Sequence, residues 1–177
     1  MSTIEPGTYK LDPSHSEVGF EVRHAGISKV RGLFEDAEAT LTIAENSQDN
    51  TLEAVIKTAS IYTHNEQRDG HIKGEEFFNV EKYPEITFKA SGFTIGQEDF
   101  TIPGELTILD TTKEIELTAS YNGTAADPMG NTRAGFEAET TISRKDFGLS
   151  WNAALEAGGV LVSDKVKIVI DASLIKE

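Results

Sequence analysis

The sequence predicts an all-β fold: an extended, eight-stranded antiparallel barrel with a short helical insert near residues 65–78. Apolar and polar residues alternate at a period of two along about eight segments, which is typical of strands with one buried face. Turn-forming residues separate these segments, and some of the strands are long and show bulge signals. Because bulges permit the coiling that closure requires, the pattern favours a barrel over a sandwich. We expect residues 1–177 to form a single domain.

Three strands precede the insert. In the first strand, Glu17, Glu21 and Arg23 share the polar face. The second strand changes phase near Glu35–Asp36, which predicts a bulge, and the third strand follows a polar turn at residues 45–50. The residues that these three strands place inward by phase are Val18, Phe20, Val22, His24, Val30, Gly32, Phe34, Ala37, Ala39, Leu41, Ile43, Leu52, Ala54 and Ile56.

Five strands follow the insert. Pro103 cannot donate to a strand ladder, so Pro103–Gly104 predicts a bulge or a barrel edge. A further short helix at residues 151–156 is an open alternative before the last strand. The inward residues of the five strands are Ile86, Phe88 and Ala90; Phe100, Ile102, Leu106 and Ile108; Ile115, Leu117, Ala119 and Tyr121; Ala134, Phe136, Ala138, Thr140, Ile142 and Arg144; and Val166, Ile168, Ile170 and Ala172.

The composition excludes several classes of function. Thirty acidic and sixteen basic residues give a net charge of −14, which repels nucleic-acid phosphates and anionic membrane surfaces. We therefore expect no nucleic-acid partner. The absence of cysteine excludes disulfides, thiolate nucleophiles and cysteine-type zinc sites. The apolar runs are far shorter than the roughly 20 residues that span a bilayer, so we expect no stable membrane insertion.

The first ten residues lack the basic and apolar segments of a signal peptide, and Pro6–Gly7 would interrupt such a segment. We therefore expect a cytoplasmic protein, or a periplasmic one if a leader has been removed. The sequence leaves the oligomeric state open, with a homodimer as one alternative.

The insert carries the first group of candidate functional residues. On a helix, His64, Arg68 and His71 would form one polar stripe at positions i, i+4 and i+7. The two histidines would then lie roughly 10 Å apart along the helix axis, too far to share an ion, so we expect no metal site. A solvated charged face is an equally good interpretation of this stripe. For Asp69, a structural role is favoured.

Aromatic residues follow the polar part of the insert. Phe77, Phe78 and Tyr83 either plug one end of the barrel as core, which is the favoured interpretation, or line the throat of a cavity.

Two residues on inward strand faces are polar. For His24 a structural role is favoured. An inward arginine must find an anion or several acceptors, because an unpaired buried charge is very unfavourable. Asp146 is a candidate partner for Arg144, and the anionic head of a bound ligand is the alternative.

Signals for catalysis are weak, since no nucleophile with an obvious base and no glycine-rich phosphate loop is found. Three functions therefore remain in competition. The first is a non-catalytic lipid carrier or store. The second is an enzyme that uses His24, His71, Arg68 and Asp69 as acid, base and anion clamp. The third is a packed barrel whose outer surface binds a protein.

Motifs spread over nearly the whole chain resemble those of the YceI family of lipocalin-like, polyisoprenoid-binding proteins. The motifs are Y-x-L-D-P-x-H-S-x-V-x-F-x-V-x-H from Tyr9 to His24, G-x-F at 32–34, R-D-x-H at 68–71, Phe77-Phe78, Y-P-x-I-x-F at 83–88 and R-x-D-F-G-L at 144–149.

The resemblance implies a lipocalin-like barrel around an apolar cavity for an isoprenoid tail, such as that of a quinone or a prenyl phosphate. It implies no catalytic residue and no cofactor beyond the bound isoprenoid lipid. From the strand phase and this resemblance together, we expect the following residues to contact the ligand: Val18, Phe20, Val22, His24, Phe34, Arg68, His71, Phe77, Phe78, Phe88, Phe136, Ile142, Arg144 and Phe147.

Overall fold

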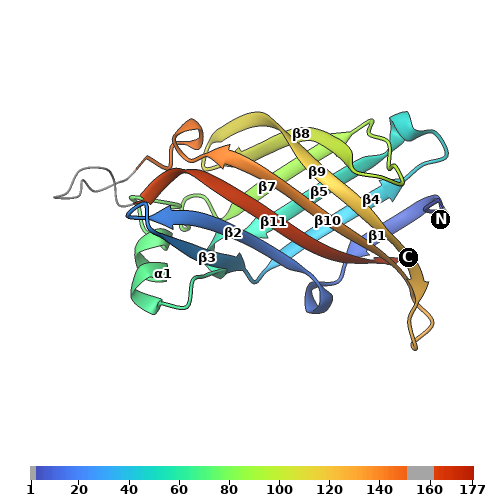
Figure 1. Cartoon of the computed structure of the whole chain (residues 1–177), viewed down its shortest axis with the longest axis horizontal. Helices are drawn as coiled ribbons and strands as arrows, with labels where there is room; N and C mark the ends of the chain where they lie inside the picture. Colours follow the sequence, from blue (N-terminus) through green and yellow to red (C-terminus); the bar gives the residue numbers. More distant parts are fainter. Residues whose placement is uncertain (1–2, 151–161) are drawn as a thin grey trace.

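The computed structural model describes residues 3–150 and 162–177, and its strands are antiparallel throughout (Figure 1). The short helix expected at 151–156 lies outside the described residues. The described helix and strands are α1 (Glu66–Lys73), β1 (Gly7–Leu11), β2 (Glu17–His24), β3 (Ser28–Phe34), β4 (Ala37–Ile43), β5 (Thr51–Lys57), β6 (Ile61–Tyr62), β7 (Glu85–Ser91), β8 (Phe100–Ile108), β9 (Thr111–Ala126), β10 (Thr132–Ser143) and β11 (Val162–Lys176).

The strand segments close into an eight-stranded barrel, which confirms the predicted fold. The order β1-β4-β5-β7-β8-β9-β10-β11 returns to its start because β11 pairs with β1. The remaining segments extend three of these strands. β2 continues β1 after the turn Pro13–His15, β3 leads into β4, and β6 continues β5 after the turn Thr58–Ser60. β11 is long enough to pair with β1 near its end and with β2 near its start.

The predicted strand irregularities are present. The phase change at Glu35–Asp36 is the break between β3 and β4. The ladder between β7 and β8 ends at Gly104, and the next residue, Pro103, pairs with Glu116 of β9 alone among the described ladders. Pro103 therefore occupies an edge position, where its missing N–H leaves no ladder bond unmade.

The barrel has two unlike ends (Figure 1). The closed end carries the two termini, and the open end carries α1 and the β2–β3 hairpin. Buried residues fill the closed end, with Tyr9 fully inaccessible at its centre. The other buried side chains that pack there include Leu41, Ile43, Phe93, Tyr121, Ala134 and Leu174.

The open end contains a seam in the barrel wall. The ladder between β5 and β7 ends at the pair Lys57 and Glu85, and β6 then pairs with β3 alone over the described ranges. Two hydrogen bonds from Thr58 to the carbonyls of Tyr83 and Pro84, at 2.9 and 3.0 Å, mark the last link across this gap. Beyond that link, α1 lies beside β6 at the open end.

Arg133 joins two loops at the closed end. Its Nη1 donates to Asp12 Oδ2 at 2.7 Å and its Nε donates to Asp127 Oδ2 at 2.8 Å. The bond from Arg133 holds the pKa of Asp12 well below its usual value. The backbone N–H of Asn131 and the side chain of Arg133 lower the pKa of Asp127 to about 2. Both carboxylates therefore stabilise the folded state in their ionised form.

We expect Arg133→Met to destabilise the barrel in a manner that depends on pH. Lowered carboxyl pKa values contribute stability above the unfolded pKa of about 4, and this contribution disappears as pH falls through the folded values. The difference in urea midpoint between wild type and variant should thus be largest near about pH 7 and shrink below about pH 4. Lys89→Met, on the exposed face of β7, is the control. A difference that stays constant down to about pH 2.5 would contradict this assignment.

Candidate functional site

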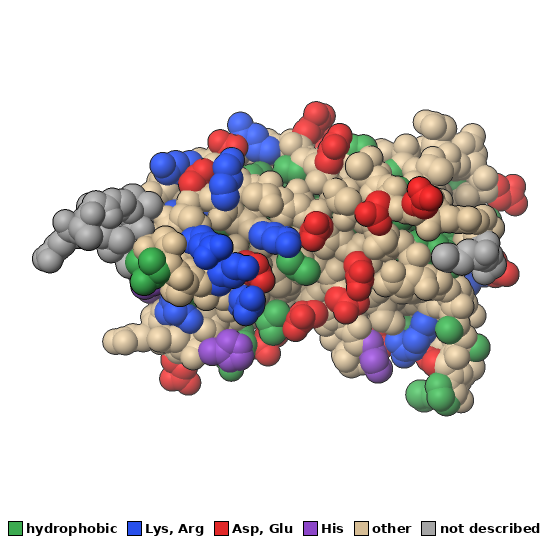
Figure 2. Space-filling view, in the orientation of Figure 1, with side chains coloured by type: hydrophobic (Ala, Val, Ile, Leu, Met, Phe, Trp, Pro, Cys, Tyr) green, Lys and Arg blue, Asp and Glu red, His purple; other side chains and the backbone are tan. Residues whose placement is uncertain are grey.

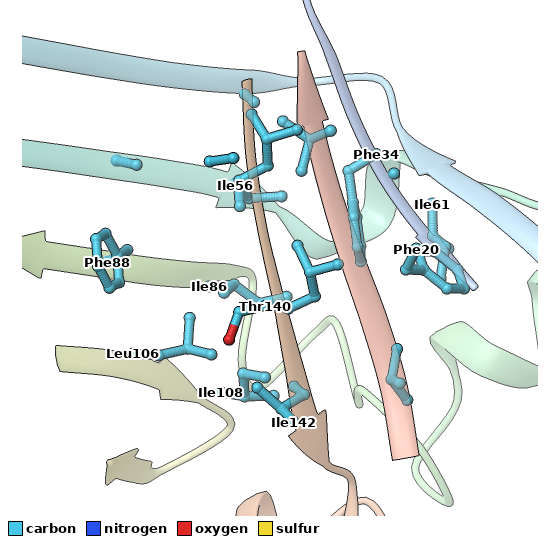
Figure 3. A pocket seen from close by; sticks show the side chains of 18 of the residues that line it. Phe20, Phe34, Ile56, Ile61, Ile86, Phe88, Leu106, Ile108, Thr140 and Ile142 are labelled. Atoms are coloured by element: carbon cyan, nitrogen blue, oxygen red, sulfur yellow. The ribbon is translucent and has the colours of Figure 1, made fainter. Parts of the chain in front are cut away.

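A cavity of about 690 Å³ occupies the barrel interior, and inward side chains of the strands line it (Figure 3). Its wall is almost entirely aliphatic and aromatic. Val18, Phe20, Val22 and Phe34 are only half-buried because part of each side chain faces this space. Six polar residues of the lining lie at the open end, on β2, on α1 and at its N-cap: Arg23, His24, Asn65, Gln67, Arg68 and His71.

All of the predicted ligand-contacting residues except Phe147 line this cavity. Phe147 is buried in the core, in the turn Lys145–Phe147, and does not contribute to the cavity wall. Strand phase could not place Phe147, because it lies beyond the end of β10. Contact of the remaining residues with a ligand stays a prediction.

An aromatic cluster lies beneath the open end. The ring of Phe34 packs 5.6 Å from Phe20 and 5.9 Å from Phe78, measured between centroids. The Phe20 ring lies directly over Gly32, its partner on β3, where an added Cβ would come within 2.2 Å of the ring. Phe77 and Phe78 thus line the throat of the cavity, and Phe78 also packs against the core. Both interpretations therefore hold for Phe78, whereas Phe77 lines the cavity without being part of the core.

The helix α1 is shorter than the predicted insert, and it begins after His64, the first residue of the predicted polar stripe. Asn65 caps it by accepting from the N–H of Arg68 at 3.0 Å, and the helix ends at Gly74. His64 precedes the helix with a left-handed backbone, φ 63°, so the predicted stripe of His64, Arg68 and His71 is wrong. An asparagine is a strong N-cap, so the helix begins at Glu66, two residues after His64.

Asp69 has the structural role that was favoured. It is buried, and its Oδ1 accepts from the backbone N–H and the hydroxyl of Thr63. These bonds fasten α1 to the chain that leaves β6. His71 instead pairs with Glu76 on the surface, at 2.8 Å, where both side chains are exposed. Of the four residues of the enzyme hypothesis, His24, Arg68 and His71 line the cavity, whereas Asp69 is engaged by Thr63 and does not line it.

Arg68 lies where the cavity meets the surface. Its Nε donates to Thr63 Oγ1 at 2.8 Å and its Nη2 donates to the Thr63 carbonyl. In the part of the chain that the structure describes, no hydrogen bond or ion pair occupies Nη1. Arg68 also lines a polar surface depression beside the cavity, formed with His24, Ser28, Lys29, Val30, Arg31, Thr63 and His64. The guanidinium is therefore anchored on one side and available on the other.

Arg144 is pinned by the backbone. It is 4% exposed, and its Nε, Nη1 and Nη2 donate to the carbonyls of Ser163, Leu149 and Val162 at 2.8, 2.7 and 3.2 Å. Burial lowers the pKa of Arg144, while the charge of Asp164 opposes that shift. The predicted partner Asp146 is thus replaced by three carbonyls and by Asp164. Sequence reasoning missed Val162, Ser163 and Asp164 because they belong to a segment almost twenty residues away, while Leu149 lies only five residues from Arg144.

Thr140 lines the cavity. The strand phase places it inward, but it was not among the residues predicted to contact the ligand. Its hydroxyl lies on the apolar wall of β10, among Leu106, Ile108 and Ile142 (Figure 3). The strand phase contained the signal, since Thr140 falls on the same face as Phe136 and Ile142. Among residues 3–150 and 162–177, no group of three or more histidine or carboxylate side chains could hold a metal ion.

An eight-stranded antiparallel barrel with a deep apolar interior and a polar mouth defines a barrel of the lipocalin-like type. Residues 9–174 match the YceI-like domain, and the chain belongs to the YceI family. The described residues contain no helix long and apolar enough to cross a membrane.

Named relatives and solved structures agree with this assignment. Protein YceI of Escherichia coli is 38% identical over 144 residues, which cover 80% of this chain and 75% of that protein. The crystal structure of the Campylobacter jejuni YceI protein is 30% identical, with a TM-score of 0.73 over 100% of this chain and 99% of that one. A polyisoprenoid binding domain from Saccharophagus degradans has a TM-score of 0.67 over 98% of this chain and 100% of that one, and at 15% identity it shows the fold alone.

Proposed function

We propose that this protein binds an isoprenoid lipid inside the barrel and acts as a non-catalytic carrier or store. The apolar cavity of about 690 Å³ is the observation that carries the proposal. A wall with so few polar groups suits a long hydrocarbon tail, which makes no specific polar demands. Membership of the YceI family supports the same class of ligand, as does the fold shared with the polyisoprenoid binding domain of Saccharophagus degradans.

The tail occupies the interior and the polar head lies at the open end. Burial of about 500 Å² of ligand surface would contribute roughly 12 kcal/mol, at about 25 cal/mol per Å². Association costs of about 4–15 kcal/mol offset much of this gain, so contacts to the head decide the net affinity. Arg68 is the residue for that contact, because its Nη1 is available whereas the donors of Arg144 bind carbonyls.

The head is either a prenyl phosphate or a quinone, and Arg68→Met separates them. A charge-assisted bond to phosphate contributes roughly 1.5–3 kcal/mol, and a bond to a neutral carbonyl about 1 kcal/mol. We expect the variant to bind a prenyl phosphate about tenfold or more weaker, and a quinone of equal tail length a few-fold weaker. Titration of delipidated protein measures both, and solvent extraction with mass spectrometry identifies the ligand that copurifies.

Lys73→Met, at the other end of α1, is the matched control for loss of one positive charge. It should leave both affinities unchanged, since Lys73 is not part of the cavity wall. Failure of the wild-type protein to bind either ligand would refute the proposed function. Equal affinities of Arg68→Met and wild type for both ligands would place the head elsewhere.

A further inference from the structure

A cluster of cations lies on the outer face of β2, β3 and β11 beside the open end, in a protein of net charge −14. Figure 2 shows basic side chains gathered on this part of the surface, while acidic side chains predominate toward the other end. We call this cluster the basic patch, and all five of its members are exposed: Arg23, Lys29, Arg31, Lys165 and Lys167.

The basic patch is incompletely neutralised by the protein itself. Arg31 binds Glu21 at 2.9 Å, and Lys29 reaches the same carboxylate only at 4.0 Å. Arg23 and Lys165 form no ion pair within the described parts of the chain. Arg23 and Lys29 also face each other directly across the β2–β3 ladder. Like charges in that position oppose folding, so this arrangement is suited to an anionic partner.

An exposed apolar residue projects beside the basic patch. Ile27 forms the tip of the β2–β3 hairpin and is 85% exposed. Ala25 and Gly26 have positive φ values of 53° and 72°, which turn the chain tightly and present Ile27 to solvent. Basic residues with an apolar tip are the combination by which proteins bind the surface of an anionic bilayer without spanning it.

We infer that the basic patch and Ile27 dock the open end of the barrel on an anionic lipid bilayer. The inference builds on the proposed function, because docking there would bring the cavity mouth to the membrane that holds an isoprenoid lipid. Charge complementarity selects the bilayer's phosphates, and Ile27 enters the interface between head groups and acyl chains. The overall negative charge limits the attraction to this end and keeps it sensitive to salt, because ions screen exposed charges.

The test is cosedimentation of the full chain with vesicles of phosphatidylcholine alone or mixed with phosphatidylglycerol. We expect binding to the mixed vesicles at low salt and little binding to phosphatidylcholine. The double variant Arg23→Gln and Lys29→Gln should bind the mixed vesicles at least about tenfold more weakly than wild type. The variant should still fold, because the substitutions remove a like-charge pair that opposes folding. The matched control, Lys10→Gln with Lys89→Gln, has the same net charge and should bind like wild type. Equal loss in both double variants would overturn the inference.

Two exposed apolar residues at opposite ends test the orientation. Ile27→Ser should weaken vesicle binding several-fold, whereas Met129→Ser, at the 87% exposed tip of the β9–β10 hairpin, should not. Uptake of a prenyl ligand from solution is measured in parallel. Uptake without vesicle binding refutes docking and leaves the proposed function intact. Vesicle binding without uptake supports docking and refutes the proposed function.

Discussion

Arg144→Met is expected to destabilise the barrel by roughly 3 kcal/mol or more. The substitution keeps most of the aliphatic stem but removes the donors that three backbone carbonyls accept. Each carbonyl left without a partner at a buried site costs about 1–3 kcal/mol. The bonds to Val162 and Ser163 tie the residue after β10 to the start of β11, so their loss loosens this corner of the open end. Urea unfolding measures the change in the free energy of unfolding.

Lys145→Met supplies the control for Arg144→Met. Lys145 is exposed in the neighbouring turn, and its removal should change stability by no more than about 0.5 kcal/mol. An Arg144→Met protein as stable as wild type, with weakened ligand binding, would show that the arginine serves the ligand and not the fold.

Filling the cavity is expected to abolish tight ligand binding without unfolding the protein. Ala54 on β5 and Ala138 on β10 both line the cavity, and the two strands lie four places apart in the ring of eight. A phenylalanine at either site would displace roughly 100 Å² of ligand contact, about 2.5 kcal/mol at about 25 cal/mol per Å². We therefore expect affinity for a prenyl ligand to fall more than tenfold in Ala54→Phe and in Ala138→Phe.

Thermal unfolding accompanies each titration, because a ring that meets other side chains instead of empty space would cost about 1–3 kcal/mol. Ala125→Phe, on the exposed end of β9, adds the same ring outside the cavity and should change neither quantity. Undiminished ligand affinity in both cavity variants would show that the ligand does not occupy the barrel.

Much of the barrel could be predicted from the sequence, because a strand has a period of two and one face of each strand is buried. That regularity predicted the eight strands and the break at Glu35–Asp36, and the missing N–H of proline predicted the edge position of Pro103. It also placed Phe20, Phe88 and the other inward residues on the cavity wall.

The polar contacts could not be predicted in this way, since they depend on segments that meet only in the fold. Arg144, for example, binds the carbonyls of Val162 and Ser163. The asparagine cap that excludes His64 from α1 is instead a local signal, which the strand period does not contain. The net charge likewise misrepresents the surface. It predicts repulsion from anions everywhere, whereas register places Arg23 opposite Lys29 and concentrates positive charge at one end.

The seam between β6 and β7 would let a ligand leave the barrel at a rate that does not depend on the rate of unfolding. Where a ladder surrounds a cavity completely, the contents leave through the mouth or by breaking strand pairs. Here an eight-residue helix lies beside β6 at the gap, fastened by the cap of Asn65 and the bonds between Asp69 and Thr63. Displacement of a short helix is a microsecond to millisecond event, far faster than unfolding of a barrel. For the ligand proposed to bind in the barrel, substitutions in α1 would therefore change the residence time while the strands of this protein stay unchanged.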